Sequence, residues 1–241
     1  MPKNLKSTNS RPSVSIIIPA LNEAGNVENT TQAILDALGK QGIPDFEMIV
    51  IDDGSTDGTG KIVDELAAKN KQIKAFHNSV PRGLGYDFRI GASLASKDYI
   101  GWFPGDNETL PETINAILEQ IGKVDIIIPY TINPQVRSLY RQLLSSAYTL
   151  LFNNLFGLHL KYFNGPCFFR RDLLKTIIMS TDGPAYMAEI LIQLIKRDDM
   201  SYLEVPMYIK VRDYGKNSVL KWKNIYLIGK TIASLIYRIY F

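Results

Sequence analysis

Short runs of β-branched residues alternate with helical segments in the first half of this chain, and this alternation constrains its fold more than any other feature. Residues 13–19 (SVSIIIP) and 46–51 (FEMIVI) have the composition of strands that are buried on both faces. Apolar residues at helical spacing follow each of them, over residues 24–38 and 61–68. Strands that alternate with helices predict an α/β fold with a mostly parallel sheet flanked by helices.

The alternation continues toward the middle of the chain and then changes. Further strands are predicted at residues 73–76, 99–103 and 124–128, and further helices at 85–95 and 111–121. The second half is different, with predicted helices at 137–156, 171–179 and 186–197 and a strand at 202–211. Ligands of parallel sheets bind beyond the carboxyl ends of the strands. This rule selects four loops, at residues 19–23, 52–58, 77–85 and 104–108.

Charge and cysteine content exclude several functions. The 241 residues carry a net charge of only +3, so we expect no nucleic-acid partner. The one cysteine, Cys167, excludes an internal disulfide and a multi-cysteine zinc site, and two histidines leave few ligands for a histidine-based centre. The chemistry must therefore rest on carboxylates, arginines, backbone groups and an oxygen-bound metal.

Polar residues follow the first two predicted strands at the edge where a ligand is expected. The first strand ends in Pro19, and Asn22 and Glu23 come shortly after it. The second ends in the adjacent carboxylates Asp52 and Asp53, which repel one another unless the hydrogen-bond donors of a ribose or a base edge bind them. Helix capping is the alternative interpretation of both loops. A calcium loop is excluded, because that loop requires a helix before it and here a strand precedes it.

The third loop is basic and glycine-rich. Arg82 and Gly83 precede a predicted helix, where glycine lets the backbone approach a phosphate and arginine supplies positive charge. The loop is not a dinucleotide-binding fingerprint, because Phe88 stands where the third glycine belongs.

The fourth loop carries the candidate metal ligands. Asp106 and Glu108 alternate on the segment that follows the strand at residues 99–103. Their oxygens are the ligands that Mg²⁺ or Mn²⁺ prefers, and the cation would be shared with the phosphates of a donor. A helix-capping turn that leads into Pro111 is the alternative interpretation.

Taken in order, these loops resemble those of the family 2 inverting glycosyltransferases, which have the GT-A fold. The motifs that carry the likeness are PALNE at 19–23, IVIDDGSTDGT at 49–59 and GDNE at 105–108, and the resemblance extends over residues 13–220. Within the family, the segment RRDLL after NGP, then Glu189, then EVPMYIKVRDYGKNS are most similar to the polyprenyl-phosphate, dolichyl-phosphate mannosyltransferase-like branch.

The resemblance implies a role for each candidate residue. The nucleoside of a UDP- or GDP-sugar would be held by Pro19, Asn22, Glu23 and Asp52 or Asp53. A divalent metal would be held by Asp106, which matches the second aspartate of a DxD motif, and by Glu108. Arg212 and Lys216, in an R-x-x-x-K-x-S pattern with Ser218, would meet phosphates of the donor or the acceptor. We therefore expect Asp106, Arg212 and Lys216 to be the catalytic residues.

Two departures from the family pattern affect the metal and the acceptor. Pro104 stands where the first aspartate of DxD belongs, and residues 164–166 (NGP) replace the serine-glycine-phenylalanine segment of the usual acceptor pocket. A phosphate acceptor fits the remaining residues, because it is already anionic and needs cations in place of a general base. Arg137 and Arg141, one helical turn apart, are suitable cations, although ordinary solvated helices show the same spacing.

The chain ends in an amphipathic segment. One side of the predicted helix carries Trp222, Ile225, Ile228, Ile232, Leu235 and Ile239. The other side carries Lys223, Lys230 and Arg238. This pattern is typical of a helix that lies in a membrane interface, since no apolar run reaches the ~18 residues that a spanning helix needs. Residues 143–160 predict a second such helix, and either could instead be a core element or a contact between copies in an oligomer.

We therefore expect a disordered arm at residues 1–12, a glycosyltransferase domain at 13–218 and an amphipathic membrane-interface helix at 219–241, in a peripheral protein on the cytoplasmic face of a membrane. The predicted reaction moves a sugar from a UDP- or GDP-sugar to a polyprenyl or dolichyl phosphate with Mg²⁺ or Mn²⁺. Transfer to a hydroxyl of a saccharide, lipid or protein is an alternative that needs a base, either Asp106 or Glu189. A catalytically silent binding or regulatory relative is the second alternative, supported only by Pro104.

Overall fold

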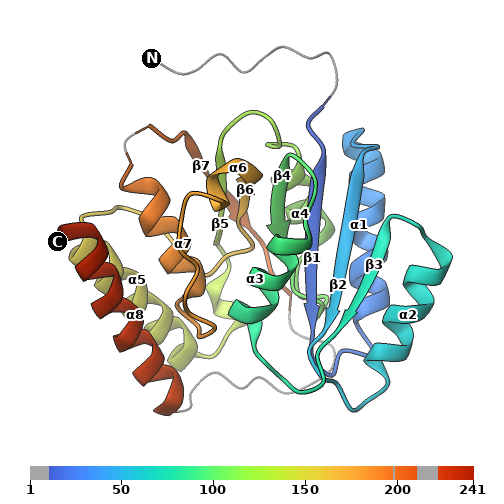
Figure 1. The fold of residues 1–241 in the computed structure, drawn as a ribbon, viewed down its shortest axis with the longest axis horizontal. Helices are drawn as coiled ribbons and strands as arrows, with labels where there is room; N and C mark the ends of the chain where they lie inside the picture. The colour runs from blue at the N-terminus through green and yellow to red at the C-terminus, as the bar shows by residue number, and fades with distance from the viewer. Residues whose placement is uncertain (1–10, 198, 211–221) are drawn as a thin grey trace.

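The computed structural model describes residues 11–197, 199–210 and 222–241, in which helices cover both faces of a central sheet (Figure 1). In chain order the elements are β1 (Val14–Ala20), α1 (Val27–Gln41), β2 (Phe46–Asp52), α2 (Thr59–Lys69), β3 (Ile73–His77), α3 (Leu84–Leu94), β4 (Tyr99–Trp102), α4 (Pro111–Leu118), β5 (Ile126–Thr131), a 3₁₀ turn η1 (Pro134–Val136), α5 (Leu139–Phe156), β6 (Phe168–Arg170), α6 (Arg171–Leu174), α7 (Tyr186–Ile195), β7 (Tyr202–Met207) and α8 (Trp222–Tyr240).

The described strands form one seven-stranded sheet in the order β3-β2-β1-β4-β6-β5-β7. Its pairings are parallel except for β6, which runs antiparallel to both β4 and β5. The predicted mostly parallel α/β architecture is confirmed. Strand β6 was not predicted, because three residues are too few to show a periodicity.

Several predicted element boundaries differ from the structure, and two of them have a visible local reason. The helix predicted over residues 171–179 ends at Leu174, where the Thr176 hydroxyl donates to the Leu173 carbonyl at 2.6 Å and competes with the helical ladder. The helix predicted from residue 137 begins at Leu139, after the η1 turn, with Ser138 as its N-cap. The last strand ends at Met207 and does not continue to residue 210.

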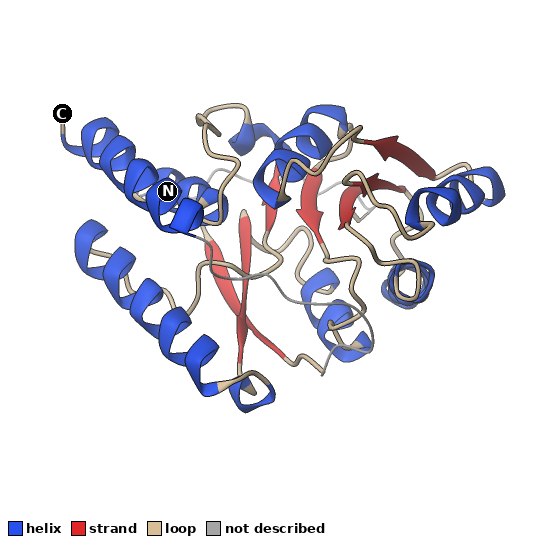
Figure 2. Ribbon diagram, turned by 90° about the horizontal axis from the view of Figure 1, so that it is seen from below, coloured by secondary structure: helices blue, strands red, loops and turns tan. Residues whose placement is uncertain are grey.

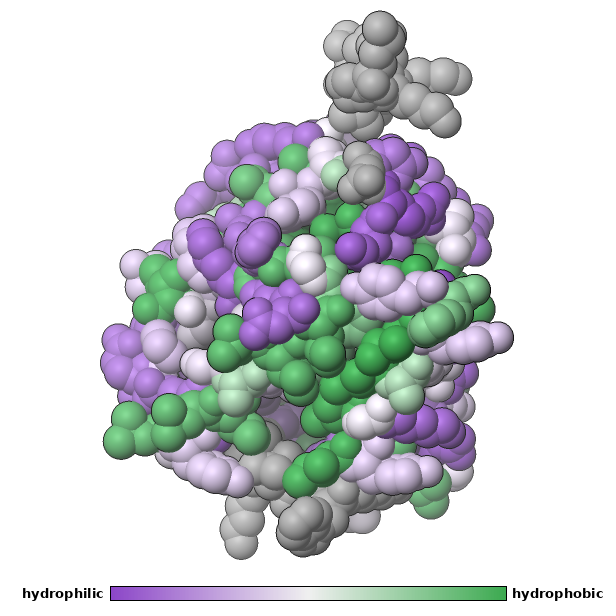
Figure 3. Space-filling model, turned by 90° about the vertical axis from the view of Figure 1, so that its left-hand side faces the viewer, coloured by the Kyte–Doolittle hydropathy of each residue, from purple (hydrophilic) through white to green (hydrophobic). Residues whose placement is uncertain are grey.

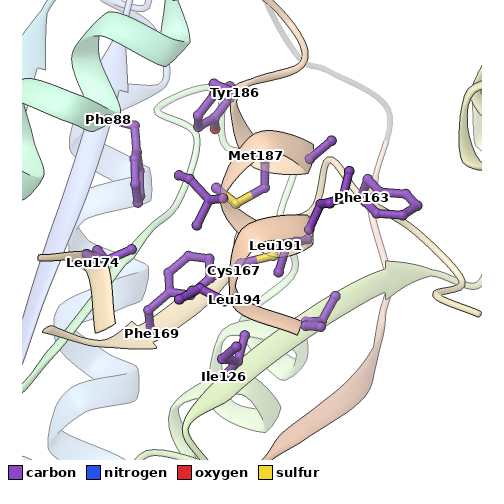
Figure 4. Packing of buried hydrophobic residues seen from close by; sticks show 14 of the residues in the cluster. Phe88, Ile126, Phe163, Cys167, Phe169, Leu174, Tyr186, Met187, Leu191 and Leu194 are labelled. Atoms are coloured by element: carbon purple, nitrogen blue, oxygen red, sulfur yellow. The ribbon is translucent and has the colours of Figure 1, made fainter. Parts of the chain in front are cut away.

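The sheet separates two apolar layers. Ile16 and Ile18 of β1 point into a layer that includes residues of α1 and α4, whereas Ile17 points into a layer that includes residues of α3 and α7. Figure 4 shows part of this second layer, where Met187 and Leu191 of α7 lie beside Cys167 and Phe169.

Close packing between β4 and β6 requires a glycine. A Cβ atom on Gly101 would lie 2.2 Å from the ring of Phe168, the residue opposite it in the antiparallel ladder. This contact brings the end of β4 against the start of β6, which determines the shape of the site described below.

Helix α8 is part of the folded body. Leu235 is fully buried, and Ile228, Ile232 and Ile239 pack against the core, so most of the apolar stripe expected to face a membrane faces the protein instead. Arg238, expected on the solvated side, donates to the buried carboxylate of Glu189 on α7 at 3.1 Å. The apolar stripe thus fits the alternative of a core helix, and on the opposite side Lys230 is exposed whereas Arg238 turns inward to a buried glutamate.

Helices α5 and α8 lie at one end of the sheet, and their C-terminal ends meet (Figures 1 and 2). Phe156 and Tyr240 stack with ring centroids 6.4 Å apart, and the Tyr240 hydroxyl donates to the Leu155 carbonyl. In the part of the chain that the structure describes, no helix combines the length and hydropathy required to cross a bilayer.

Candidate active site

Two neighbouring cavities open at the edge where the parallel strands end. The first, of about 250 Å³, is bounded by the ends of β1 and β4 and the segment before β6; we call it the strand-end cavity. The second, of about 370 Å³, follows one side of α5 and is called the α5 cavity. Both are lined by Arg137, Arg141 and Tyr162, so these three residues form the boundary between them.

Asp106 and Glu108 line the strand-end cavity from the turn after β4. The Glu108 backbone N–H donates to Asp106 Oδ1 at 3.1 Å, and Asn107 between them adopts a left-handed φ of 57°, which asparagine tolerates. Burial raises the pKa of Asp106, although the nearby charges of Arg137 and Arg141 oppose the rise. Burial and the charge of Asp106 likewise raise the pKa of Glu108.

This pair of carboxylates fits a hard divalent cation that completes its coordination with substrate phosphates. Magnesium is commonly held by one or two carboxylates together with phosphates and water. Among the described residues, no group of three or more histidine, cysteine, aspartate or glutamate side chains could hold a metal ion without a substrate. The residues therefore suit Mg²⁺ or Mn²⁺ that arrives with a diphosphate.

The loop after β1 brings two further candidates to the same cavity. Pro19 and Glu23 both line it. Glu23 is only 6% exposed, its carboxylate accepts from Asn26 Nδ2 at 2.7 Å, and its backbone N–H donates to Thr59 Oγ1 at 2.8 Å. The structure thus places Pro19 and Glu23 in one cavity with the two candidate metal ligands.

Asn22 and Asp52 lie outside the lining of this cavity and connect the loops around it. Asn22, at a left-handed φ of 55°, accepts from the Thr56 backbone N–H at 2.9 Å. Asp52 accepts from the Ser55 backbone N–H at 3.0 Å and contacts His77 Nδ1 at 3.2 Å. Asn22 thus holds the loop after β1 against the loop after β2, and Asp52 connects the loop after β2 to the end of β3.

Asp53 organises the loop that contains Arg82 and Gly83. Its carboxylate is 3% exposed and accepts from the backbone N–H groups of Arg82 and Gly83 at 2.7 and 2.9 Å, and from Asn78 Nδ2 at 2.8 Å. The Arg82 guanidinium lies over the ring of Tyr86 at 4.6 Å from its centroid. The repulsion expected between Asp52 and Asp53 is therefore relieved within the protein, by the donors of two different loops.

A third buried carboxylate, Asp87, lies close to Asp53, which was not predicted from the sequence. It is 2% exposed on the first turn of α3 and accepts from the same Asn78 Nδ2 that binds Asp53, at 2.9 Å. Burial and the charge of Asp53 raise its pKa to about 7, against the effect of the Asn78 hydrogen bond. The sequence alone showed only a polar residue at an apolar-looking helix start.

Replacing Asp87 with asparagine should change how stability depends on pH. With a folded pKa of about 7 and an ordinary value of 3.8, the folded state holds a proton that the unfolded chain releases, so stability falls as pH rises from about 4 to about 7. Asparagine keeps the acceptor for Asn78 and removes this loss, so Asp87→Asn should be more stable at pH 8 by up to about 4 kcal/mol. Urea unfolding at pH 5 and pH 8 measures it.

The exposed Asp36 on α1 supplies the control for that measurement. Asp36→Asn should leave the pH profile of stability unchanged. Parallel profiles for wild type and Asp87→Asn would show that Asp87 does not hold a proton in the folded state.

One other described candidate, Glu189, stands apart from the cavities. Glu189 lines neither of them and accepts from Ser180 Oγ and Arg238 Nη1, so of the two possible bases only Asp106 borders the strand-end cavity. Arg212 and Lys216 lie outside the described residues.

Sequence comparison decides the family. The model of glycosyl transferase family 2 matches residues 15–178, which include all four loops. The chain belongs to this family. The predicted family is confirmed.

Relatives of this glycosyltransferase include two enzymes named for lipid phosphates. It is 29% identical over 236 residues to a dolichol-phosphate mannosyltransferase of Pyrococcus furiosus, covering 94% of this chain and 62% of the relative. It is 25% identical over 217 residues to an undecaprenyl-phosphate mannosyltransferase of Micrococcus luteus, covering 86% of this chain and 87% of the relative. Other relatives are longer: the chain spans 18% of glycosyltransferase AglD of Haloferax volcanii and 33% of the uncharacterized glycosyltransferase EpsJ of Bacillus subtilis.

Solved structures confirm the GT-A fold. Mannosyl-3-phosphoglycerate synthase of Rubrobacter xylanophilus superposes with a TM-score of 0.67 at 16% identity, covering 94% of this chain and 74% of that one. A second solved structure is glucosyl-3-phosphoglycerate synthase of Mycobacterium tuberculosis in complex with Mn²⁺, UDP-glucose and phosphoglyceric acid. It superposes with a TM-score of 0.62 at 21% identity, covering 95% of this chain and 80% of that one.

Proposed function

We propose that this glycosyltransferase moves a sugar, with inversion, from a UDP- or GDP-sugar to the phosphate of a polyprenyl or dolichyl phosphate, with Mg²⁺ or Mn²⁺. The observation that carries the proposal is the strand-end cavity, where Asp106 and Glu108 lie within electrostatic reach of Arg137 and Arg141. The two carboxylates suit a cation bound to the donor's diphosphate, and the two arginines suit an anionic acceptor. Two relatives named for lipid-phosphate mannosyl transfer support this acceptor.

The arrangement suits a direct displacement. An acceptor phosphate oxygen bonds to the anomeric carbon while the bond from that carbon to the donor's diphosphate breaks, and the electron pair leaves with the nucleoside diphosphate. A bound divalent cation would neutralise charge on the leaving group. Arg137 and Arg141 would hold the acceptor phosphate in line, and no residue has to remove a proton from it.

The α5 cavity provides room for the acceptor beyond its reacting oxygen. Besides the two arginines it is lined by Lys161 and by hydroxyl and amide side chains of α5, namely Gln142, Ser145, Ser146, Thr149 and Asn153. Donors of this kind bind phosphate oxygens. The Arg137 guanidinium donates to the Tyr162 hydroxyl at 3.3 Å, which fixes it at the boundary of the two cavities.

An apolar surface beside the α5 cavity supports attachment to a membrane, which we propose to be on its cytoplasmic face. Figure 3 shows apolar residues gathered on the side of the molecule where α5 and α8 lie. Exposed members of this surface, 60% or more accessible, are Leu139, Tyr140, Leu143, Leu150, Tyr226, Tyr237 and Phe241. Aromatic and leucine side chains on exposed helix faces are typical of proteins that bind the interface of a bilayer.

Charged substitutions on this surface should release the protein from lipid. Leu143→Asp combined with Tyr237→Asp is expected to lower the partition into anionic vesicles by at least tenfold, because both side chains would have to bury a charge. Vesicle sedimentation measures it. Leu94→Asp, at an exposed position on α3, is the control and should change nothing. Deletion of α8 is a poorer test, because it would expose the core around Leu235 and leave Glu189 without Arg238.

Calorimetric titration of the purified protein with UDP, GDP and CDP, each with and without Mn²⁺, tests the donor part of the proposal. Metal-dependent binding of one nucleotide is expected. Failure of all three to bind a folded sample would overturn the proposal.

The stability of the product to mild acid tests the acceptor part. Transfer to a polyprenyl phosphate yields a solvent-extractable, acid-labile product. An acid-stable glycosidic product would indicate the hydroxyl alternative, with Asp106 as its base.

A further inference from the structure

Two residues that line the strand-end cavity each have a buried polar atom without a hydrogen-bond partner. Trp102 is 5% exposed at the end of β4, and its Nε1–H donates to nothing in the described structure. Asn164, on the segment before β6, has an equally buried and unpartnered Oδ1. Both residues line the strand-end cavity together with Asp106.

The sheet register explains why these two residues line the same cavity. Gly101 on β4 lies opposite Phe168 on β6 in an antiparallel pair, so the chain leaving β4 at Trp102 runs beside the chain that enters β6. Asn164 belongs to that entering segment. The two side chains therefore reach the cavity from adjacent strand ends, 62 positions apart in the sequence.

Unpartnered buried polar atoms are uncommon. Roughly nine in ten such groups in proteins find a partner, so each exception calls for an explanation. Trp102, Asn164 and Arg137 each contribute one such atom, and all three line this one cavity. Because these three atoms gather in the cavity that contains Asp106 and Glu108, a polar ligand bound there would supply the missing hydrogen-bond partners.

The chemistry of the two atoms selects the ligand. An indole N–H only donates and an amide oxygen only accepts, so the group that satisfies both must accept and donate at once. A hydroxyl does this, whereas a phosphate oxygen accepts only and would be repelled by the amide oxygen. The cavity wall also contains apolar surface from Leu84, Pro166 and Met207, which suits the C–H face of a sugar ring.

Trp102 is held in place from behind. Its ring makes an edge-to-face contact with Tyr186, centroids 6.3 Å apart, and Tyr186 in turn contacts Phe88 at 5.7 Å. Because the indole is almost fully covered, little of its ring face is available for stacking against a ligand. A ligand must displace the cavity wall slightly to reach both atoms, since neither is open to solvent.

We propose that Trp102 and Asn164 together bind one hydroxyl of the transferred sugar and so determine which sugar is accepted. This inference rests on the proposed function, because it assumes that the strand-end cavity receives a nucleotide-sugar. A site built around a hydroxyl rejects an analogue that lacks it, because the analogue leaves buried polar atoms unpaired. These two side chains would then select the sugar, while the loops after β1 and β2 bind the nucleotide.

The test compares nucleotide with nucleotide-sugar. UDP and UDP-glucose, and GDP and GDP-mannose, are titrated with Mn²⁺ into wild type, Trp102→Phe and Asn164→Ala. Asn154→Ala, at an exposed position on α5, is the control. We expect both site variants to bind the nucleotide normally and to lose about tenfold in affinity for the preferred nucleotide-sugar, the effect of one hydrogen bond left unmade.

Fluorescence gives a second readout that does not depend on activity. The chain has two tryptophans, so in a Trp222→Phe background the emission reports on Trp102 alone. The nucleotide-sugar should shift this emission to longer wavelength as the indole N–H gains a partner, and the nucleotide alone should not.

The outcomes separate this inference from the proposed function. Normal nucleotide binding with unchanged nucleotide-sugar affinity in both variants would overturn the inference, because a bound water would then be the partner of these atoms, and would leave the donor site standing. No nucleotide binding by wild type would overturn both. If Trp102→Phe fails to fold, the nucleotide-sugar affinity of Asn164→Ala alone tests the inference.

Discussion

Replacing Asp106 with asparagine should lower kcat for sugar transfer by about a thousandfold. The substitution removes the negative charge that would hold the cation on the departing diphosphate, and loss of one such electrostatic contact commonly costs two to three orders of magnitude. Asparagine keeps the size of the side chain and the oxygen that accepts from the Glu108 backbone N–H. The fold should therefore survive. Single-turnover transfer at saturating donor and Mn²⁺ measures the effect.

Glu112, exposed in the first turn of α4, provides the matched control. Glu112→Gln removes a negative charge from the same surface region, and it should retain full activity. If Asp106→Asn kept more than a tenth of the wild-type rate, the charge at this position could not be what stabilises the leaving group.

The sequence predicted the parallel strands that carry the motif loops of this site, because buried parallel strands have nearly continuous apolar sequences. The motif loops also fell where expected, since parallel strands end at one edge of the sheet. Pro19, Glu23, Asp106 and Glu108 were accordingly predicted as neighbours, and the structure brings them to one cavity. For these four residues the local sequence pattern was sufficient to predict that they lie close together.

Residues whose roles depend on partners from distant segments were not predictable in the same way. Asp53 looked free to bind a nucleoside, yet the backbone of residues 82 and 83 already occupies its carboxylate. Arg238 looked solvated until the buried Glu189 of another helix was placed beside it. Trp102 looked like one more apolar strand residue, and only the unpredicted strand β6 explains why it lines the same cavity as Asn164.

Removing both arginines at the boundary of the two cavities should nearly abolish transfer. Arg137→Ala combined with Arg141→Ala is expected to lower kcat/KM for the phosphate acceptor by about a thousandfold or more, because two charge-assisted contacts to one anion are lost. Steady-state transfer assays with varied acceptor measure it. Lys175→Ala, at an exposed position after α6, is the control and should be silent. Arg137→Lys should be intermediate, since lysine keeps the charge without the two-pronged geometry.

The same double variant distinguishes the acceptor from the donor as the partner of these arginines. Both guanidinium groups lower the pKa of Asp106 and of Glu108 through their positive charge, so their removal should not weaken Mn²⁺ binding at the carboxylates and should strengthen it slightly. If the arginines hold the acceptor, nucleotide affinity in the presence of Mn²⁺ stays within about threefold of wild type. A parallel collapse of nucleotide affinity and transfer would place them on the donor's diphosphate instead. The acceptor phosphate would then need other cations, and Lys161 in the α5 cavity is the one the described structure offers.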